Sequence, residues 1–100
     1  MHVITHARVV AAQARFPESS RALDFWYRAM KCGRFATFAE LRATFGSVDK
    51  VGPLFVFNIG GNKLRLIAAV HFNSGNVFVR HVLSHAEYDR GQWKRKEVIQ

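Results

Sequence analysis

Five side chains in the second half of this 100-residue sequence have the chemistry needed to act on a phosphodiester bond. Two arginines offer planar guanidinium groups that bind phosphate oxygens in two places, and a lysine adds a compact positive charge. A histidine can exchange protons near neutral pH, and a tyrosine can donate a proton or stack on a base. In chain order the five residues are Lys63, Arg65, Arg80, His85 and Tyr88.

These groups match the needs of RNA cleavage without a metal ion. The 2′-OH of RNA can attack the adjacent phosphorus once its proton is removed, and the departing 5′ oxygen must then be protonated. Arg65 and Arg80 suit stabilisation of the charged phosphorane between these steps. Lys63 could neutralise phosphate or help to activate the nucleophile. The sequence does not decide which of the remaining two residues is the acid and which is the base.

The chain as a whole is strongly basic. Lys and Arg number 15 against 7 Asp and Glu, which gives a net charge of +8. A domain with this balance is typical of proteins that meet a polyanion, and nucleic acid is the first candidate. A membrane surface, an acidic protein partner and a charge that only maintains solubility remain open from composition alone.

Length and composition predict a single folded domain covering residues 1–100, with residues 90–100 as a basic C-terminal tail. Hydrophobic residues make up 49% of the chain, and no apolar run approaches the ~20 residues of a membrane span. The first residues lack the layout of a signal peptide. A lone cysteine, Cys32, cannot form an internal disulfide, which suits a reducing cytosol. We therefore expect a cytoplasmic protein in which this thiol is structural.

The first half of the chain predicts helices. Pro17 biases the residue before it away from the helical region, so a boundary falls there. Thr37 and Glu40 have the spacing of a capping box, and Gly46 is a natural terminator. The expected helices are residues 6–15, a segment from Ser19 or Ser20 to about Lys31, and residues 37–45.

The second half predicts a three-stranded antiparallel meander over about residues 54–59, 63–72 and 77–83. Gly60-Gly61 is typical of a two-residue hairpin loop, and Ser74-Gly75 would form a second one. Two-residue loops fix the cross-strand pairs as Phe57 with Leu64, Asn58 with Lys63, Val56 with Arg65, Val79 with Val70, and Arg80 with Ala69.

Because side chains alternate along a strand, this register assigns the two faces of the sheet. One face is apolar from Phe55 to Val79 and should be covered by the helices. His81 is predicted beyond Val79 on this core face, as a structural residue. The other carries three cations, with no acidic residue to neutralise them. It could be an ordinary solvated face, but cations mixed with apolar groups suit a phosphate backbone with flat bases. Its expected members are Asn58, Lys63, Arg65, His71, Arg80, Val56, Ile67, Phe78 and Val82.

Two segments resemble a known family. They are Asn58-Ile59-Gly60-Gly61-Asn62-Lys63-Leu64-Arg65-Leu66, and Arg80 followed by Ser84-His85-Ala86-Glu87-Tyr88-Asp89. Together they are similar to the HigB-type toxins of type II toxin–antitoxin pairs, which belong to the RelE superfamily. The resemblance covers nearly the whole chain. It departs mildly at Ser84, where the family pattern has threonine.

The resemblance implies a compact RelE-like α+β domain, with an N-terminal strand and with helices on one face of a small antiparallel sheet. It implies a metal-independent, ribosome-dependent endoribonuclease that cleaves mRNA, inhibits translation and is itself inhibited by a cognate helix-turn-helix antitoxin of the HigA type. Arg65 and Arg80 occupy the matching positions of the RelE-like site, so the resemblance implies that they bind the reacting phosphate.

No cofactor or metal is expected. His81 and His85 are four residues apart, but a zinc site at this spacing needs a helix, and the segment resembles strand and turn. The acidic residues are scattered, without the carboxylate cluster of a two-metal nuclease. Gly60-Gly61 turns one strand back onto another and so does not form a nucleotide-binding loop.

Other interpretations of these residues remain open. His85 could cap a turn, and Tyr88 could pack on the core. The chain could be a non-catalytic RNA- or ribosome-binding module, which needs the basic face but no proton-transfer groups. It could also resemble the ParE branch of the superfamily and inhibit a protein target such as DNA gyrase. The presence of all five side chains favours the nuclease.

Overall fold

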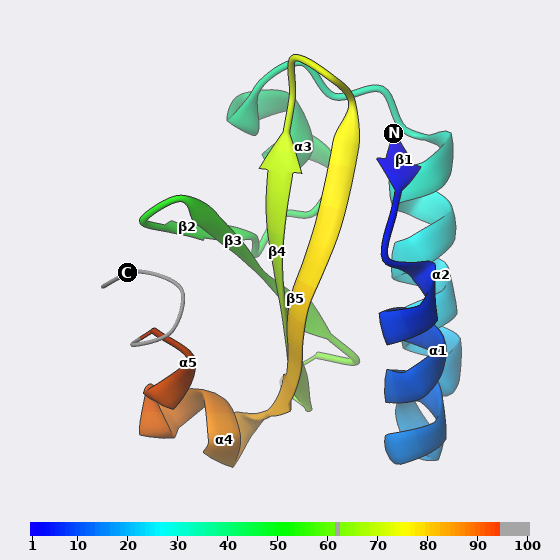
Figure 1. Cartoon of the computed structure of the whole chain (residues 1–100), viewed down its shortest axis with the longest axis vertical. Coiled ribbons are helices and arrows are strands. Elements are labelled where there is room, and N and C mark those ends of the chain that lie inside the picture. Colours follow the sequence, from blue (N-terminus) through cyan, green and yellow to red (C-terminus); the bar gives the residue numbers. More distant parts are fainter. Residues whose placement is uncertain (62, 95–100) are drawn as a thin grey trace.

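A five-stranded sheet with strand order β1-β5-β4-β3-β2 forms the centre of the protein. The computed structural model describes residues 1–61 and 63–94. Strand β1 runs parallel to β5, and the other neighbours are antiparallel. Helices α1 and α2 lie along one side of the sheet, and α4 and α5 lie beyond the end of β5 (Figure 1). The fold class predicted from the sequence, helices on one face of a small, mainly antiparallel sheet, is confirmed.

The elements follow one another in an order close to the predicted one. The strands are β1 (His2–Val3), β2 (Asp49–Val51), β3 (Leu54–Ile59), β4 (Leu64–His71) and β5 (Asn76–Ser84). The helices are α1 (His6–Arg15), α2 (Ser20–Cys32), α3 (Phe38–Thr44), α4 (His85–Arg90) and α5 (Gln92–Lys94), with a 3-10 turn at Pro17–Ser19.

The three predicted N-terminal helices are present. The stripe on α2 is buried, with Leu23, Trp26 and Met30 each at most 1% exposed. The Thr37 hydroxyl caps α3 by accepting the backbone N–H of Glu40 at 3.2 Å. The buried side chains of α2 pack with residues of β3, β4 and β5 in the main hydrophobic core. The helical layer therefore determines which face of the sheet is covered.

The first hairpin is longer than predicted. Ile59 pairs with Leu64, so the loop is residues 60–63 rather than Gly60-Gly61, and Asn58 pairs with Arg65 instead of Lys63. Each partner on β4 has moved by two residues, and an even shift keeps every side chain on its expected face. The predicted pairs were wrong and the predicted faces right, except that Lys63 lies in the loop and not on the strand.

The second hairpin also has a four-residue loop, and β5 carries a bulge. Val70 pairs with Val77 and not with Val79, and the register changes by one residue opposite Ile67 and Ala68. Arg80 is the extra residue, so it does not pair with Ala69. A bulge inserts one residue into one strand of a pair, which exchanges the two faces beyond it.

The bulge corrects the predicted positions of two side chains. His81 pairs with Ile67 on the face expected to be open, whereas it was predicted on the core face. Val82, predicted on the open face, pairs with Leu66 and packs against the main core. Arg80 and His81 are adjacent polar residues between Val79 and Val82, and residue types alone do not show which of the two is inserted.

The face expected to be open has a core of its own. Trp93 is 4% exposed and packs on a cluster that includes Val56 and Ile67, which are 3% and 0% exposed. The residues that we expected to form a basic tail from about residue 90 therefore include helix α5. The rest of that expected tail, residues 95–100, lies outside the described residues.

Two strands were not found from periodicity. Strands β1 and β2 have two and three residues, too few for an alternating pattern to stand out. The N-terminal strand implied by the family resemblance is confirmed as β1. In the described part of the chain, no helix is both long and apolar enough to cross a membrane.

Candidate functional site

The start of β4 and helix α4 carry three of the five predicted side chains. Arg65 lies between Asn58 on β3 and Leu83 on β5. Its guanidinium carbon is 5.6 Å from the ring centroid of Tyr88, within the range of a cation–π contact. His85 lies three residues before Tyr88 on α4, and side chains at this spacing are neighbours on a helix surface. Arg65 thus contacts Tyr88, and His85 lies next to Tyr88 on the same helix; we refer to these three residues as the cluster around α4.

Local hydrogen bonds allow a helix of only six residues to hold this position. The Ser84 hydroxyl accepts the backbone N–H of Glu87 at 3.2 Å, and the Glu87 carboxylate accepts the N–H of Ser84 at 3.0 Å. This reciprocal pair is a complete capping box. The helix ends at Gly91, whose φ of 71° is the left-handed conformation that glycine adopts readily. The residue that caps α4 is therefore Ser84, and not His85 as one of the open interpretations had it.

Tyr88 is held between two side chains. Its ring stacks on Trp93 with centroids 5.4 Å apart and an interplanar angle of 19°. The indole N–H of Trp93 donates to the Tyr88 carbonyl at 3.3 Å. Because Trp93 is buried on the sheet, it fixes the ring against which the Arg65 guanidinium lies. Trp93 therefore contributes to the site, although the sequence predicted that this residue belongs to the basic tail.

His85 has a carboxylate partner. Its Nδ1 lies 2.9 Å from Oδ2 of Asp89, one helical turn further along α4. An ionised carboxylate only accepts hydrogen bonds, so the imidazole nitrogen facing it carries the proton. In neutral His85 the basic nitrogen is therefore Nε2, which is the arrangement that a general base needs. The spacing of four residues between His85 and Asp89 could have revealed this pair in the sequence.

A salt bridge connects α4 to the helical layer. Nη2 of Arg15, at the end of α1, is 2.9 Å from both carboxylate oxygens of Glu87. The pKa of Glu87 lies below its usual range, first because the Ser84 N–H donates to the carboxylate and then because Arg15 does. Ser-x-x-Glu is visible in the sequence as a capping box, but no local signal connects Arg15 to a residue 72 positions away.

The Arg15–Glu87 bridge predicts a change in the titration of Glu87. A folded-state pKa below the unfolded value of about 4.3 means that ionised Glu87 stabilises the fold above that pH, and this contribution is lost as the pH falls through the folded-state pKa. Replacing Arg15 with glutamine should raise the pKa of Glu87 in an NMR titration. Arg28→Gln, exposed on α2 and paired with Asp24, is the control. An unchanged Glu87 titration in Arg15→Gln would show that the bridge does not form.

The other two predicted residues lie on neither α4 nor the strand β4. Lys63 is exposed in the loop before β4, two residues from Arg65 along the chain. Arg80 is exposed at the bulge of β5 and lines a groove between β5 and α1. The sequence register brought Arg65 and Arg80 onto one face of adjacent strands. In the structure Arg80 is the extra residue of β5 opposite Ile67 and Ala68, and it lines the groove beside α1, whereas Leu83 pairs with Arg65.

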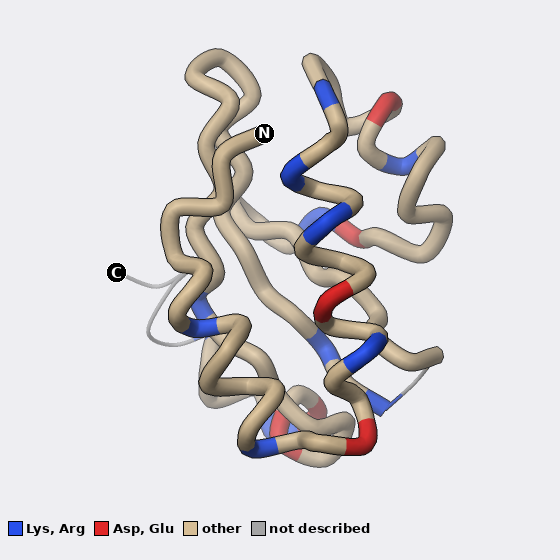
Figure 2. The backbone as a smooth tube through the Cα atoms, turned by 90° about the vertical axis from the view of Figure 1, so that its right-hand side faces the viewer, with Lys and Arg blue, Asp and Glu red and all other residues tan. Residues whose placement is uncertain are grey.

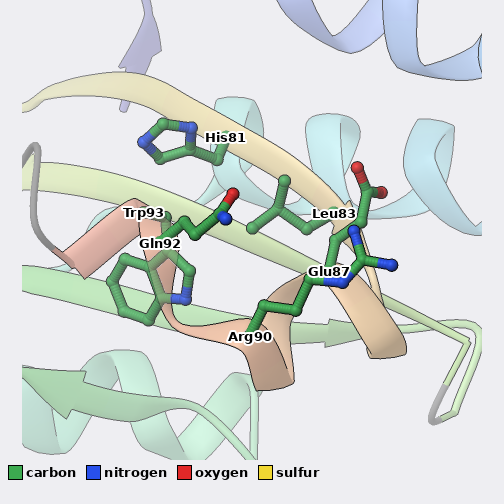
Figure 3. Close-up of a pocket in the computed structure, with 6 residues that line it drawn as sticks. All are labelled: His81, Leu83, Glu87, Arg90, Gln92 and Trp93. Atoms are coloured by element: carbon green, nitrogen blue, oxygen red, sulfur yellow. The ribbon is translucent and has the colours of Figure 1, made fainter.

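A pocket of about 190 Å³ lies beside α4 on its β5 side. Figure 3 shows His81 and Leu83 from β5 on one side of it and Glu87, Arg90 and Trp93 from the C-terminal helices on the other. His81 reaches this pocket because of the bulge. His71, at the other end of β4, packs edge-on against Phe78. Within residues 1–61 and 63–94, no three His, Cys, Asp or Glu side chains are grouped so that they could hold a metal ion.

The α+β fold, with helices on one face of a mainly antiparallel sheet, is that of the RelE-like class of toxins. A family model described as "HigB_toxin, RelE-like toxic component of a toxin-antitoxin system" matches residues 19–91. The chain belongs to this family of HigB toxins.

Curated relatives agree with the family match. The chain is 36% identical to the mRNA interferase HigB of Escherichia coli O6:H1 over 93 residues, 90% of each chain. It is also 36% identical over 92 residues to the mRNA interferase toxin HigB of Escherichia coli K12 and to the mRNA interferase HigB of Shigella flexneri, covering 89% of this chain and 88% of each relative. Membership of a toxin–antitoxin family implies an antitoxin as a partner.

Proposed function

We propose that this chain is a toxin that cleaves mRNA on the ribosome and so inhibits translation. The proposal includes a metal-independent reaction in which the 2′-OH of the RNA attacks the adjacent phosphorus. The cluster of Arg65, His85 and Tyr88, in a chain similar to proteins named mRNA interferases, carries this proposal. The proposed site of action is the cytoplasm, where translating ribosomes are found, and the proposed inhibitor is a helix-turn-helix antitoxin of the HigA type.

Each group has a defined task in the proposed reaction. Nε2 of His85 takes the proton of the 2′-OH while the 2′ oxygen bonds to phosphorus. Arg65 binds the non-bridging oxygens and stabilises their charge in the phosphorane. The Tyr88 hydroxyl gives a proton to the 5′ oxygen as its bond to phosphorus breaks. The products are a 2′,3′-cyclic phosphate and a 5′-hydroxyl, so atoms and charges balance without a cofactor.

Lys63 has a supporting electrostatic task. It is exposed in the loop before β4, two residues before Arg65. A lysine ammonium is a point charge on a long flexible stem, which suits attraction of a phosphate more than fixed orientation of it. Arg80 was predicted to share the reacting phosphate. It lies at the bulge of β5 and lines the groove beside α1.

Mapping of mRNA 5′ ends in translating bacterial cells tests this function. Expression of the wild-type chain should create new 5′ ends inside coding regions, and Arg65→Ala and Tyr88→Ala should abolish most of them. Unchanged transcript ends during toxic expression would contradict the nuclease function. Loss of DNA supercoiling in the same cells would instead indicate a gyrase inhibitor. Equal cleavage by both variants and the wild type would remove the proposed site.

A further inference from the structure

A basic groove of about 390 Å³ lies between α1 and β5, outside the cluster around α4. Arg8 and Arg15 from α1 line it together with Arg80 from β5, and Ala11 lies between the two helical arginines. None of the described residues that line the groove is acidic. Figure 2 looks onto the side of the molecule that carries α1 and α2 and shows Lys and Arg positions along both helices.

Hydrogen bonds hold two of these arginines across the groove. Arg8 and Arg15 are seven residues apart, about two turns of helix, so they project from the same side of α1. Nη1 of Arg8 donates to the backbone carbonyl of Arg80 at 2.7 Å, and Arg15 donates to Glu87 on α4. The guanidinium of Arg15 also lies 4.7 Å from the ring centroid of Phe16. A guanidinium has five N–H donors, so these contacts orient the groups and leave donors for a ligand.

One residue of the groove is the strand neighbour of Arg65 in the proposed reaction site. Leu83 lines the groove and is also the residue paired with Arg65 on the adjacent strand. Neighbouring strands lie about 4.8 Å apart, which is less than the length of one nucleotide in an extended strand. Glu87, the acidic side chain beside this path, is already neutralised by Arg15. An RNA strand whose phosphate sits at Arg65 can therefore continue into the groove without meeting an unpaired carboxylate there.

We propose that the α1–β5 groove binds the phosphate backbone of the RNA next to the cleaved bond, through Arg8, Arg15 and Arg80. This inference rests on the proposed function and extends it to substrate binding. It assigns Arg80 to holding RNA rather than to the reacting phosphate. The fork of donors on arginine fits phosphate oxygens, and the pairing of the groove residue Leu83 with Arg65 favours RNA over an acidic segment of a protein partner.

Two matched substitutions on α1 test the groove. Ala11→Glu places a carboxylate between Arg8 and Arg15, whereas Ala14→Glu adds the same charge to an exposed position that does not line the groove. Binding of a fluorescent 2′-O-methyl RNA, which cannot be cleaved, is measured over a range of salt concentrations. Ala11→Glu should weaken binding by about 10-fold more than Ala14→Glu. Arg8→Gln should reduce the slope of log affinity against log salt by about 0.7, the value for one phosphate contact on a single strand.

Cleavage on ribosomes programmed with one mRNA gives a second measurement. Ala11→Glu should raise KM by a similar factor and change kcat much less, while thermal unfolding controls for folding. Equal RNA affinity in Ala11→Glu and Ala14→Glu would overturn the inference. If only Ala11→Glu lost co-purification with the antitoxin while RNA binding stayed equal, the groove would be a protein interface instead. A wild-type chain that binds RNA through the groove but cuts no mRNA would contradict the proposed function and not this inference.

Discussion

Replacing Arg65 with alanine is expected to slow mRNA cleavage by about 10²–10³-fold, the effect of removing one donor that stabilises charge in a transition state. Arg65 is the only predicted arginine whose guanidinium lies within the described cluster on α4, 5.6 Å from the Tyr88 ring centroid. The loss should fall on kcat, because the charge on the phosphorane is larger than the charge on the bound phosphodiester. Single-turnover cleavage on programmed ribosomes measures it.

Lysine at the same position separates charge from geometry. Arg65→Lys keeps the positive charge but loses the planar fork, so it should recover only part of the lost rate. Arg28→Ala, which removes an exposed cation from α2, is the control for net charge and should stay within about twofold of the wild type. Cleavage by Arg65→Ala at the wild-type rate would remove the guanidinium from the mechanism.

Replacing Trp93 with alanine is expected to cost about 3 kcal/mol of folding free energy, at the low end of the range for a buried aromatic side chain. The indole covers Leu54, Val56 and Ile67 and is 4% exposed. Helix α5 has only three residues, so relaxation around the lost side chain should keep the cost low. For a domain of this length the melting temperature should fall by roughly 12–24 °C. Thermal unfolding followed by circular dichroism measures the change.

The same substitution should also loosen the candidate site. Without the stacked indole, Tyr88 loses the surface that holds its ring beneath Arg65. Trp93→Phe keeps an aromatic partner and should lose less stability and less activity. The contrasting result would be Trp93→Ala with wild-type stability, which would mean that the second core does not form. Wild-type stability with lost activity would mean that the indole contacts RNA directly.

Much of the fold follows from residue patterns. The helical stripe of Leu23, Trp26 and Met30 and the alternation along β3 and β4 gave correct elements and correct faces. The loop lengths were wrong, because Gly60-Gly61 supports a two-residue loop and a longer one equally well. Next to both loops the faces survived this error, since the pairs shifted by two residues and side chains alternate with a period of two; beyond the bulge in β5 they did not.

The candidate site was predictable where it depended on short spacings. His85 and Tyr88 share α4 because Ser84 and Glu87, three residues apart, form its capping box. Arg80 was placed wrongly because the sequence does not show which of the adjacent polar residues Arg80 and His81 is inserted at the bulge. Arg15 was missed since its contact with Glu87 arises only from tertiary packing.

The chemistry of the RNA ends tests the central claim most directly. mRNA cut by the wild-type chain on ribosomes should carry 5′-hydroxyl ends and 2′,3′-cyclic phosphate or 3′-phosphate ends, because the 2′-OH is the proposed nucleophile. A 2′-deoxy nucleotide placed before the cut bond should prevent cleavage there. Ends that carry a 5′-phosphate and a 3′-hydroxyl, or cutting after the 2′-deoxy nucleotide, would contradict the account, since water would then be the nucleophile.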